Sequence, residues 1–207
     1  LAKSVMEGPF GLILRSSCAG ADEDEIAEDI AAMSDLANSV MADADGNEPE
    51  ALTEGDGPHI LAWREWVAPA DVITKEGCFE AEGVLDQIDA LRDPMVPLGD
   101  GTMYVEPTRA MVAVDVNTGG DTSPAAALKA NLAACRALPR ALRLRGLGGQ
   151  IVVDYAPMPK KDRAILDQVI RAAFKAETEV NIAGWTTLGL HEMTRKRDRQ
   201  PLASLLP

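Results

Sequence analysis

Long apolar runs are missing from this 207-residue sequence. No stretch of about 18 apolar residues occurs, which argues against a membrane-spanning helix. The first ten residues also lack the charged, apolar and small-residue layout of a secretory signal. We therefore expect a cytoplasmic protein. Because the chain begins with Leu1 rather than Met, we also expect a fragment or a trimmed form of a longer chain.

Cysteine and histidine are scarce as well. Cys18, Cys78 and Cys135 show no CxxC spacing, which fits reduced thiols and indicates no zinc knuckle. His59 and His191 are the only histidines, and we expect them to serve hydrogen bonding. No nucleophilic serine or cysteine–histidine pair stands out, so the sequence does not indicate a nucleophilic hydrolase or a zinc enzyme.

Basic residues are scarce in the first part of the chain only. The net charge is −13, which by itself argues against a nucleic-acid partner. Residues 1–128 contain 6 basic and 26 acidic side chains, whereas residues 129–207 contain 14 basic and 7 acidic ones. Such an asymmetry is typical of nucleic-acid contact by one half, although an accidental variation of surface charge would look the same.

The first half of the sequence predicts a few short elements joined by loops. An acidic first turn after Asp22 followed by an apolar stripe predicts a helix, and the polar stretch from 42 to 58 predicts a loop. Gly99, Asp100 and Gly101 predict a hairpin turn between strands at 95–98 and 102–105. Further elements are expected as a strand at 10–15, a strand or buried turn at 59–63, and a helix at 81–91.

The second half alternates strands and helices. Apolar, β-branched runs predict strands at 111–117, 150–155 and 180–185, and helices are expected from Ser123 to about Arg145 and from Met158 to Lys175. This order implies right-handed crossovers. We therefore predict an α/β (α+β) fold with a mixed, mainly parallel sheet.

Three oxygen-bearing side chains stand at the ends of two of these strands. Alternation places Asp115 and Asn117 on one strand face, and Asp154 ends the next strand. If the strands are neighbours, the three side chains converge at the carboxyl edge of the sheet, where they suit a Mg²⁺ ion. The alternative is that Asp115 N-caps or braces the Gly119-Gly120 turn and that Asp154 caps the next helix.

Several motifs resemble, in order, those of the ribonuclease E/ribonuclease G family. They are residues 106–120 (EPTRAMVAVDVNTGG), 131–132 (NL), 142–149 (LRLRGLGG), 151–155 (IVVDY) and 189–197 (GLHEMTRKR). The resemblance implies a DNase I-like catalytic subdomain in which Asp115 and Asp154 bind Mg²⁺. Asn117 is implied beside them, where it orients the scissile phosphate or an attacking water.

The segment 11–16 (GLILRS) resembles the family's 5′-monophosphate sensor, with Arg15 and Ser16 at the phosphate-binding positions. The resemblance then divides the chain into residues 1–57, a sensor-like segment with an acidic linker, 58–105, an RNase H-like part, and 106–207, the catalytic subdomain. No counterpart of the family's S1 domain or of its CPxCxG zinc-link motif is present. Because members of the family generally oligomerise, the resemblance implies a homo-oligomer. The missing zinc-link motif indicates that zinc does not link its subunits.

The function implied by the resemblance is magnesium-dependent cleavage of single-stranded RNA in RNA processing and decay. The alternative is a non-catalytic RNA-binding or assembly module of the same family. Basic residues of the second half are candidates for contacts with the RNA backbone: Arg143, Arg145, Lys160, Lys161, Arg195, Lys196 and Arg197.

Overall fold

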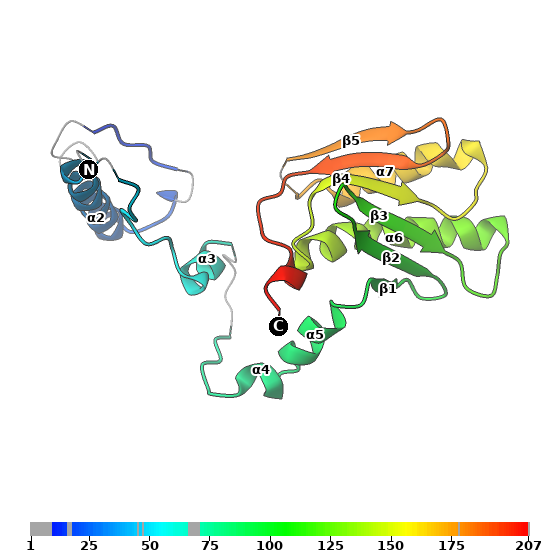
Figure 1. The fold of residues 1–207 in the computed structure, drawn as a ribbon, viewed down its shortest axis with the longest axis horizontal. Coiled ribbons are helices and arrows are strands. Elements are labelled where there is room, and N and C mark those ends of the chain that lie inside the picture. The colour runs from blue at the N-terminus through cyan, green and yellow to red at the C-terminus, as the bar shows by residue number, and fades with distance from the viewer. Residues whose placement is uncertain are drawn as a thin grey trace. The chain divides into compact units, whose positions relative to one another are not determined.

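The computed structural model describes residues 10–15, 18–44, 46, 48–65, 71–177 and 179–206, with only the backbone for 63–65. Its contacts divide the chain into two compact units, residues 1–72 and 73–207. Figure 1 shows the elements of both units. No helix in the described ranges has the length and apolar character needed to cross a membrane.

The first unit contains two described helices. Helix α2 (Glu23–Ala42) confirms the helix predicted after Asp22, whose carboxylate caps it by accepting a hydrogen bond from the Asp24 amide at 2.8 Å. Helix α3 (Pro58–Glu65) replaces the strand or buried turn expected at 59–63, and that prediction was wrong because Pro58 starts a helix.

The strand predicted at 10–15 was also wrong. These residues have no regular secondary structure, and the side chain of Ile13 is 87% exposed. A strand needs a partner strand for its backbone hydrogen bonds, and none of the described residues before Met95 belongs to a strand.

The second unit is built on a six-stranded sheet with the order β1-β2-β3-β4-β6-β5. The first hairpin confirms the turn predicted at 99–101, with β1 (Met95–Pro97) antiparallel to β2 (Thr102–Pro107). Strand β2 in turn runs antiparallel to β3 (Val112–Asn117).

The remaining strands correct the predicted topology. Strand β4 (Gly149–Asp154) is parallel to β3, but β6 (His191–Arg195) lies between β4 and β5 (Val180–Trp185) and is antiparallel to both. The sheet is therefore mostly antiparallel, and the prediction of a mainly parallel sheet was wrong. The physical reason is β6, which sequence analysis did not recognise as a strand and which occupies the position that β5 would need beside β4.

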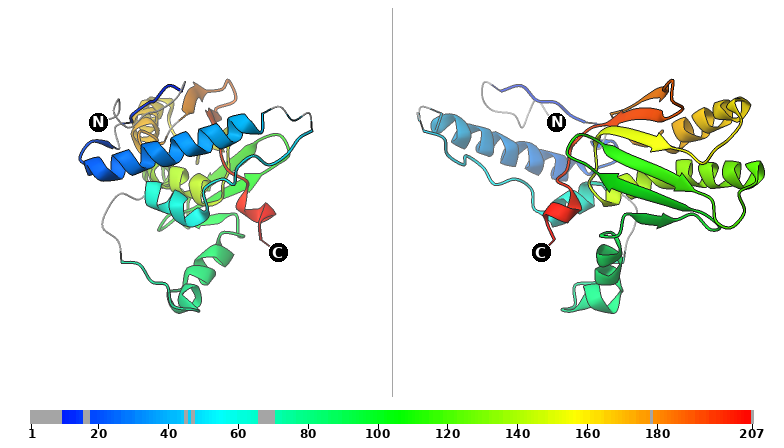
Figure 2. Two further views of the ribbon diagram at one scale, coloured as in Figure 1. Left: turned by 90° about the vertical axis from the view of Figure 1, so that its left-hand side faces the viewer. Right: turned by 45° about the vertical axis from the view of Figure 1, so that its right-hand side comes forward.

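Two long helices cover one face of this sheet, as Figures 1 and 2 show. Helix α6 (Pro124–Leu144) has Ser123 as its N-cap, which confirms the predicted helix start. Helix α7 (Arg163–Ala173) follows a short 3-10 helix, η2 (Lys160–Asp162). The inward-facing residues Val114, Ile151 and Val153 of β3 and β4 belong to the same buried core as Leu142 of α6 and Ile170 of α7.

The opposite face of the sheet is open to solvent. The side chains of β3 alternate strictly between buried and exposed, with Val112, Val114 and Val116 buried. Within the described part of residues 73–207, no helix packs on the exposed side. The shorter elements α4 (Cys78–Ala81), α5 (Val84–Ala90) and η3 (Leu202–Ser204) complete the unit, and the first two correspond to the helix predicted at 81–91.

The turn between β1 and β2 packs closely on the loop that follows β3. A Cβ atom built on Gly119 would overlap the carbonyl oxygen of Asp100, and one built on Gly101 would lie 2.5 Å from the carbonyl oxygen of Asn117. The two glycines therefore allow the β1–β2 turn and the loop after β3 to pack in direct contact, next to the carboxyl end of β3.

We predict that Gly119→Ala lowers the free energy of unfolding by about 1–3 kcal/mol, because the added methyl group must push the two loops apart. Gly120→Ala is the matched control, since a Cβ at that position has no neighbour within 4 Å and neither glycine has a positive φ. Urea denaturation of both variants measures the difference. Equal stabilities would contradict the close packing of these loops.

Candidate active site

Asp115 and Asp154 lie side by side on the open face of the sheet. They are direct register partners in the parallel pair of β3 and β4, so their Cα atoms occupy equivalent positions on adjacent strands. Parallel neighbours lie about 4.8 Å apart, and side chains at paired positions leave the same face. Both residues are exposed. The predicted convergence at the sheet's carboxyl edge is thus present in the backbone register.

Asn117 belongs to the same group. Its Nδ2 donates a hydrogen bond of 2.7 Å to Oδ2 of Asp115. This contact fixes the amide beside the carboxylate and leaves the Asn117 Oδ1 and the Asp115 Oδ1 for other partners. The three predicted residues therefore form one cluster of oxygen-bearing side chains at the carboxyl edge of β3 and β4.

Other residues fill the capping roles that were the alternative for these aspartates. Ser123 caps helix α6 by accepting a hydrogen bond from the Ala126 amide, and Asp121 accepts one from the Ser123 amide. The residue before α7 is Asp162, not Asp154. Neither Asp115 nor Asp154 is the capping residue of a described helix, so a structural cap does not explain them.

The cluster fits the ligand preferences of Mg²⁺. This ion is commonly held by one or two carboxylates, with waters and substrate phosphate completing its octahedral shell. Asp115 and Asp154 supply that number of carboxylates on adjacent strands. Among the described residues, no group of three or more histidine, cysteine or carboxylate side chains is arranged to hold a metal ion.

The predicted RNA-contacting residues fall at opposite ends of the sheet. Lys160 and Lys161 follow the carboxyl end of β4, close in sequence to Asp154. Arg195 instead pairs with Gly149, five residues before Asp154, which places it about 17 Å away along the strand. Lys196 and Arg197 continue beyond it. A single phosphate cannot reach both groups.

The seven predicted basic residues also differ in burial. Arg145 and Arg195 are each only 8% exposed, and their guanidinium groups donate hydrogen bonds to the carbonyl oxygens of Asp93 and Leu147, respectively. Arg143 and Arg195 hold the two oxygens of Glu177 at 2.6 and 3.1 Å. Arg145 and Arg195 therefore have structural roles, because they bind backbone carbonyl groups and a carboxylate within the second unit.

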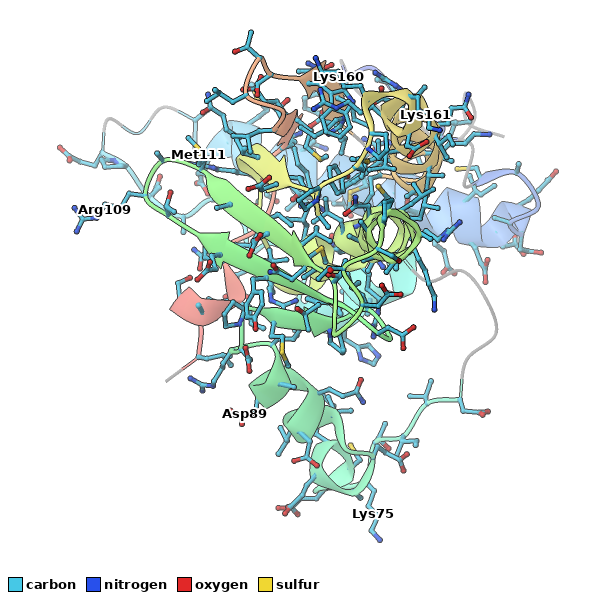
Figure 3. The ribbon with its side chains drawn as sticks, turned by 90° about the vertical axis from the view of Figure 1, so that its right-hand side faces the viewer. Lys75, Asp89, Arg109, Met111, Lys160 and Lys161 are labelled. Atoms are coloured by element: carbon cyan, nitrogen blue, oxygen red, sulfur yellow. The ribbon has the colours of Figure 1, made fainter. Side chains whose placement is uncertain are left out.

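The other predicted basic residues are exposed at the surface. Lys196 forms an ion pair with Glu179 at 2.7 Å. Lys160 and Lys161 form no ion pair with a described residue, and Figure 3 shows them at the edge of the unit above α7.

Of the predicted 5′-phosphate contacts, Ser16 lies outside the described residues. Arg15 is exposed and lines a cavity of about 740 Å³ in the first unit. Glu25 and Asp29 of α2 line the same cavity. Arg15 is thus the one basic side chain among the described residues that line it.

His191 has a structural position, in agreement with its expected hydrogen-bonding role. Its side chain is 1% exposed, and its Nε2 lies 3.1 Å from Oδ1 of Asp167, which also accepts a hydrogen bond of 3.0 Å from the Trp185 indole. The buried Nδ1 has no hydrogen-bond partner among the described residues. Burial lowers the pKa of His191 below its usual 6.5, and the charge of Arg171 lowers it further, against the opposing effect of Asp167.

We predict that protonation of His191 destabilises the second unit. Because its pKa is lower in the folded state than in the unfolded state, its contribution to stability is complete above about pH 6.5 and is lost as the pH falls. The difference in free energy of unfolding between wild type and His191→Gln should therefore shrink from about pH 7.5 to about pH 5. Urea denaturation over this range measures it, and a constant difference would contradict the prediction.

The site is thus an open sheet face with two exposed, paired aspartates at its carboxyl edge. Comparison with known proteins gives the family. The model of the Ribonuclease E/G family matches residues 67–198, and the chain belongs to this family.

Individual relatives agree. The chain is 34% identical to Ribonuclease G of Haemophilus influenzae over 135 residues, which cover 62% of this chain and 28% of that protein. It is 27% identical to Ribonuclease E of Nostoc sp. over 247 aligned positions, which cover 99% of this chain and 36% of that protein. A chloroplastic Ribonuclease E/G-like protein of Arabidopsis thaliana is 33% identical over 137 residues, 62% of this chain and 14% of its own length. The chain thus spans between 14% and 36% of the length of these relatives.

Proposed function

We propose that the chain is a magnesium-dependent endoribonuclease that cleaves single-stranded RNA, with residues 106–207 as its DNase I-like catalytic part. The observation that carries the proposal is the register of Asp115 and Asp154, which brings two carboxylates from adjacent strands to one exposed position. Membership of the Ribonuclease E/G family, and relatives named ribonucleases, support RNA as the substrate.

Each residue of the cluster has a distinct role in this proposal. Asp115 and Asp154 hold Mg²⁺, and Asn117, fixed by its hydrogen bond to Asp115, orients the scissile phosphate or the attacking water. When bound, the ion lowers the pKa of a water molecule and neutralises charge that develops on the phosphate. The open face of the sheet gives an extended strand of RNA direct access to these side chains.

Surface lysines and arginines supply further contacts with the RNA backbone. Lys160 and Lys161 lie after the carboxyl end of β4, where the chain leaves Asp154. Arg143, Lys196 and Arg197, at the other end of the sheet, contact phosphates farther along the same strand of RNA. The two buried arginines, Arg145 and Arg195, take no part in this set. We further propose that the protein acts in the cytoplasm, in RNA processing and decay, as a homo-oligomer that zinc does not link.

We predict that Asp115→Asn and Asp154→Asn each lower the rate of RNA cleavage by about 100-fold or more, because each removes a charge that holds the cation. Glu192→Gln is the matched control. Glu192 is exposed on the same face of the sheet, on β6 opposite Val152, and its replacement makes the same change of charge. Cleavage of a single-stranded RNA with Mg²⁺, and with chelator in a parallel sample, is the measurement.

The same assay separates the enzyme from a non-catalytic RNA-binding module. Magnesium-dependent products that disappear in both aspartate variants support the proposed function. Retained cleavage in the two variants would contradict the roles of Asp115 and Asp154. RNA binding by the wild-type chain without any products would favour the binding module.

We also propose that Arg15 binds the 5′-monophosphate of the substrate, with Ser16 beside it in sequence. A guanidinium group forms two parallel hydrogen bonds with a phosphate, which is the reason to choose this side chain. Arg15 lines the cavity of the first unit together with Glu25 and Asp29, which oppose an anion. For the sensor to work, the attraction of the guanidinium group for the phosphate must exceed the repulsion by both carboxylates.

We predict that wild type cleaves 5′-monophosphorylated RNA roughly ten-fold faster than 5′-hydroxyl RNA, the size of a charge-assisted hydrogen bond. Arg15→Ala should bring this ratio to about one. Arg109→Ala is the control, because Arg109 is an exposed arginine of the second unit, in the turn after β2 (Figure 3). A ratio of one in wild type would show that the acidic cavity does not sense the phosphate.

A further inference from the structure

An aromatic residue lies in the same row as the two aspartates. Tyr104 of β2 is the register partner of Asp115, which is itself the partner of Asp154. The three residues therefore cross three neighbouring strands in a line, with a spacing of about 4.8 Å from strand to strand. Tyr104 is the direct lateral neighbour of the proposed catalytic cluster.

The burial of β2 shows which way Tyr104 faces. Its chain neighbours Met103 and Val105 are 0% and 1% exposed and belong to the core under α6. Since alternate side chains of a strand leave opposite faces, Tyr104 points to the open face with Asp115. Its side chain is half-buried there, which fits a ring lying along the sheet surface.

Within the described part of the chain, no hydrogen bond of the side chain and no aromatic contact holds this ring. No described residue forms a hydrogen bond with the Tyr104 hydroxyl, and the described aromatic contacts join Tyr155, Trp185 and His191 instead. Trp185 is the other aromatic residue in the six strands, and it packs against the buried His191. Tyr104 is thus the one aromatic side chain of these strands on the open face.

Single-stranded RNA is commonly bound by stacking its unpaired bases on aromatic rings of an open sheet. We propose that Tyr104 is a positioning residue whose ring stacks on the base of a nucleotide that adjoins the scissile phosphate. This inference rests on the proposed function, because Asp115 and Asp154 define where the phosphate lies. The stacked base fixes the nucleoside sideways across β2 and so aligns the phosphodiester over the two carboxylates.

The test is a cycle of protein and substrate changes. Tyr104→Leu removes the ring but keeps a side chain of sufficient size, whereas Tyr104→Phe keeps the ring and removes only the hydroxyl. We expect Tyr104→Leu to lower kcat/KM about ten-fold, the effect of one base–aromatic stack, and Tyr104→Phe to cleave like wild type. The substrates are a single-site RNA and two versions that lack the base on one or the other side of the scissile bond.

Stacking predicts that one of the two abasic substrates slows wild type by the same factor as Tyr104→Leu, and that it slows Tyr104→Leu no further. A purely structural role of Tyr104 would leave the two effects multiplicative, and that result would overturn the inference. So would an equal loss of activity in Tyr104→Phe and Tyr104→Leu.

RNA affinity in the Asp115→Asn background distinguishes a failure of this inference from a failure of the proposed function. There the ring should strengthen binding of the intact RNA over the abasic RNA, and Tyr104→Leu should abolish that preference, whether or not the wild-type chain cleaves. An equal affinity for both RNAs with Tyr104 present would overturn the role of the ring. That result would leave the proposed function in place if the wild-type chain cleaves RNA and Asp115→Asn does not.

Discussion

The parallel pairing of β3 with β4 is the constraint on which the candidate site depends. It is the one parallel pair among the described strands, and helix α6 makes the crossover that it requires. Because both strands run the same way and in register, their carboxyl ends coincide, and Asp115 meets Asp154. An antiparallel pairing would have put these two residues at opposite edges of the sheet. The buried face of the pair anchors this arrangement, since a slip of one residue would turn either Val114 or Val153 out to solvent, depending on which strand moves.

The placement of Asp115 and Asn117 could be predicted from the sequence because it follows from alternation within a single strand. Runs of β-branched residues identified β3 and β4, and the period of two put Asp115 and Asn117 on one face. Alternation within a strand does not predict how neighbouring strands pair. The register of Tyr104 with Asp115 depends on the geometry of the turn at residues 108–111, where the Thr108 hydroxyl accepts from the Ala110 and Met111 amides. No periodicity in the sequence encodes that register.

The sheet topology was missed for a specific physical reason. Strand β6 has the sequence HEMTR, in which the buried positions are His191, Met193 and Arg195. A short segment with only one apolar residue among these three positions favours a loop, because burying polar groups inside a protein is costly unless they have partners. Here the partners come from elsewhere in the chain: Asp167 for His191, and Leu147 and Glu177 for Arg195. Only tertiary structure shows them, so β6 and the antiparallel half of the sheet could not be predicted.

The distribution of charge links the metal to the substrate. The open face bears Asp115 and Asp154 at its carboxyl edge and Glu106 and Glu192 elsewhere, so by itself it repels the phosphates of RNA. The basic residues proposed to contact RNA lie beyond the ends of the strands, with Lys160 and Lys161 after β4 and Lys196 and Arg197 after β6. Backbone contacts at the rim can hold a strand of RNA near the sheet, but they cannot lower a phosphodiester onto two carboxylates. A divalent cation held by the paired aspartates would cancel their charge and leave the rest of the face repulsive. The ion of the proposed chemistry would thereby also define the position along the sheet where the backbone can approach.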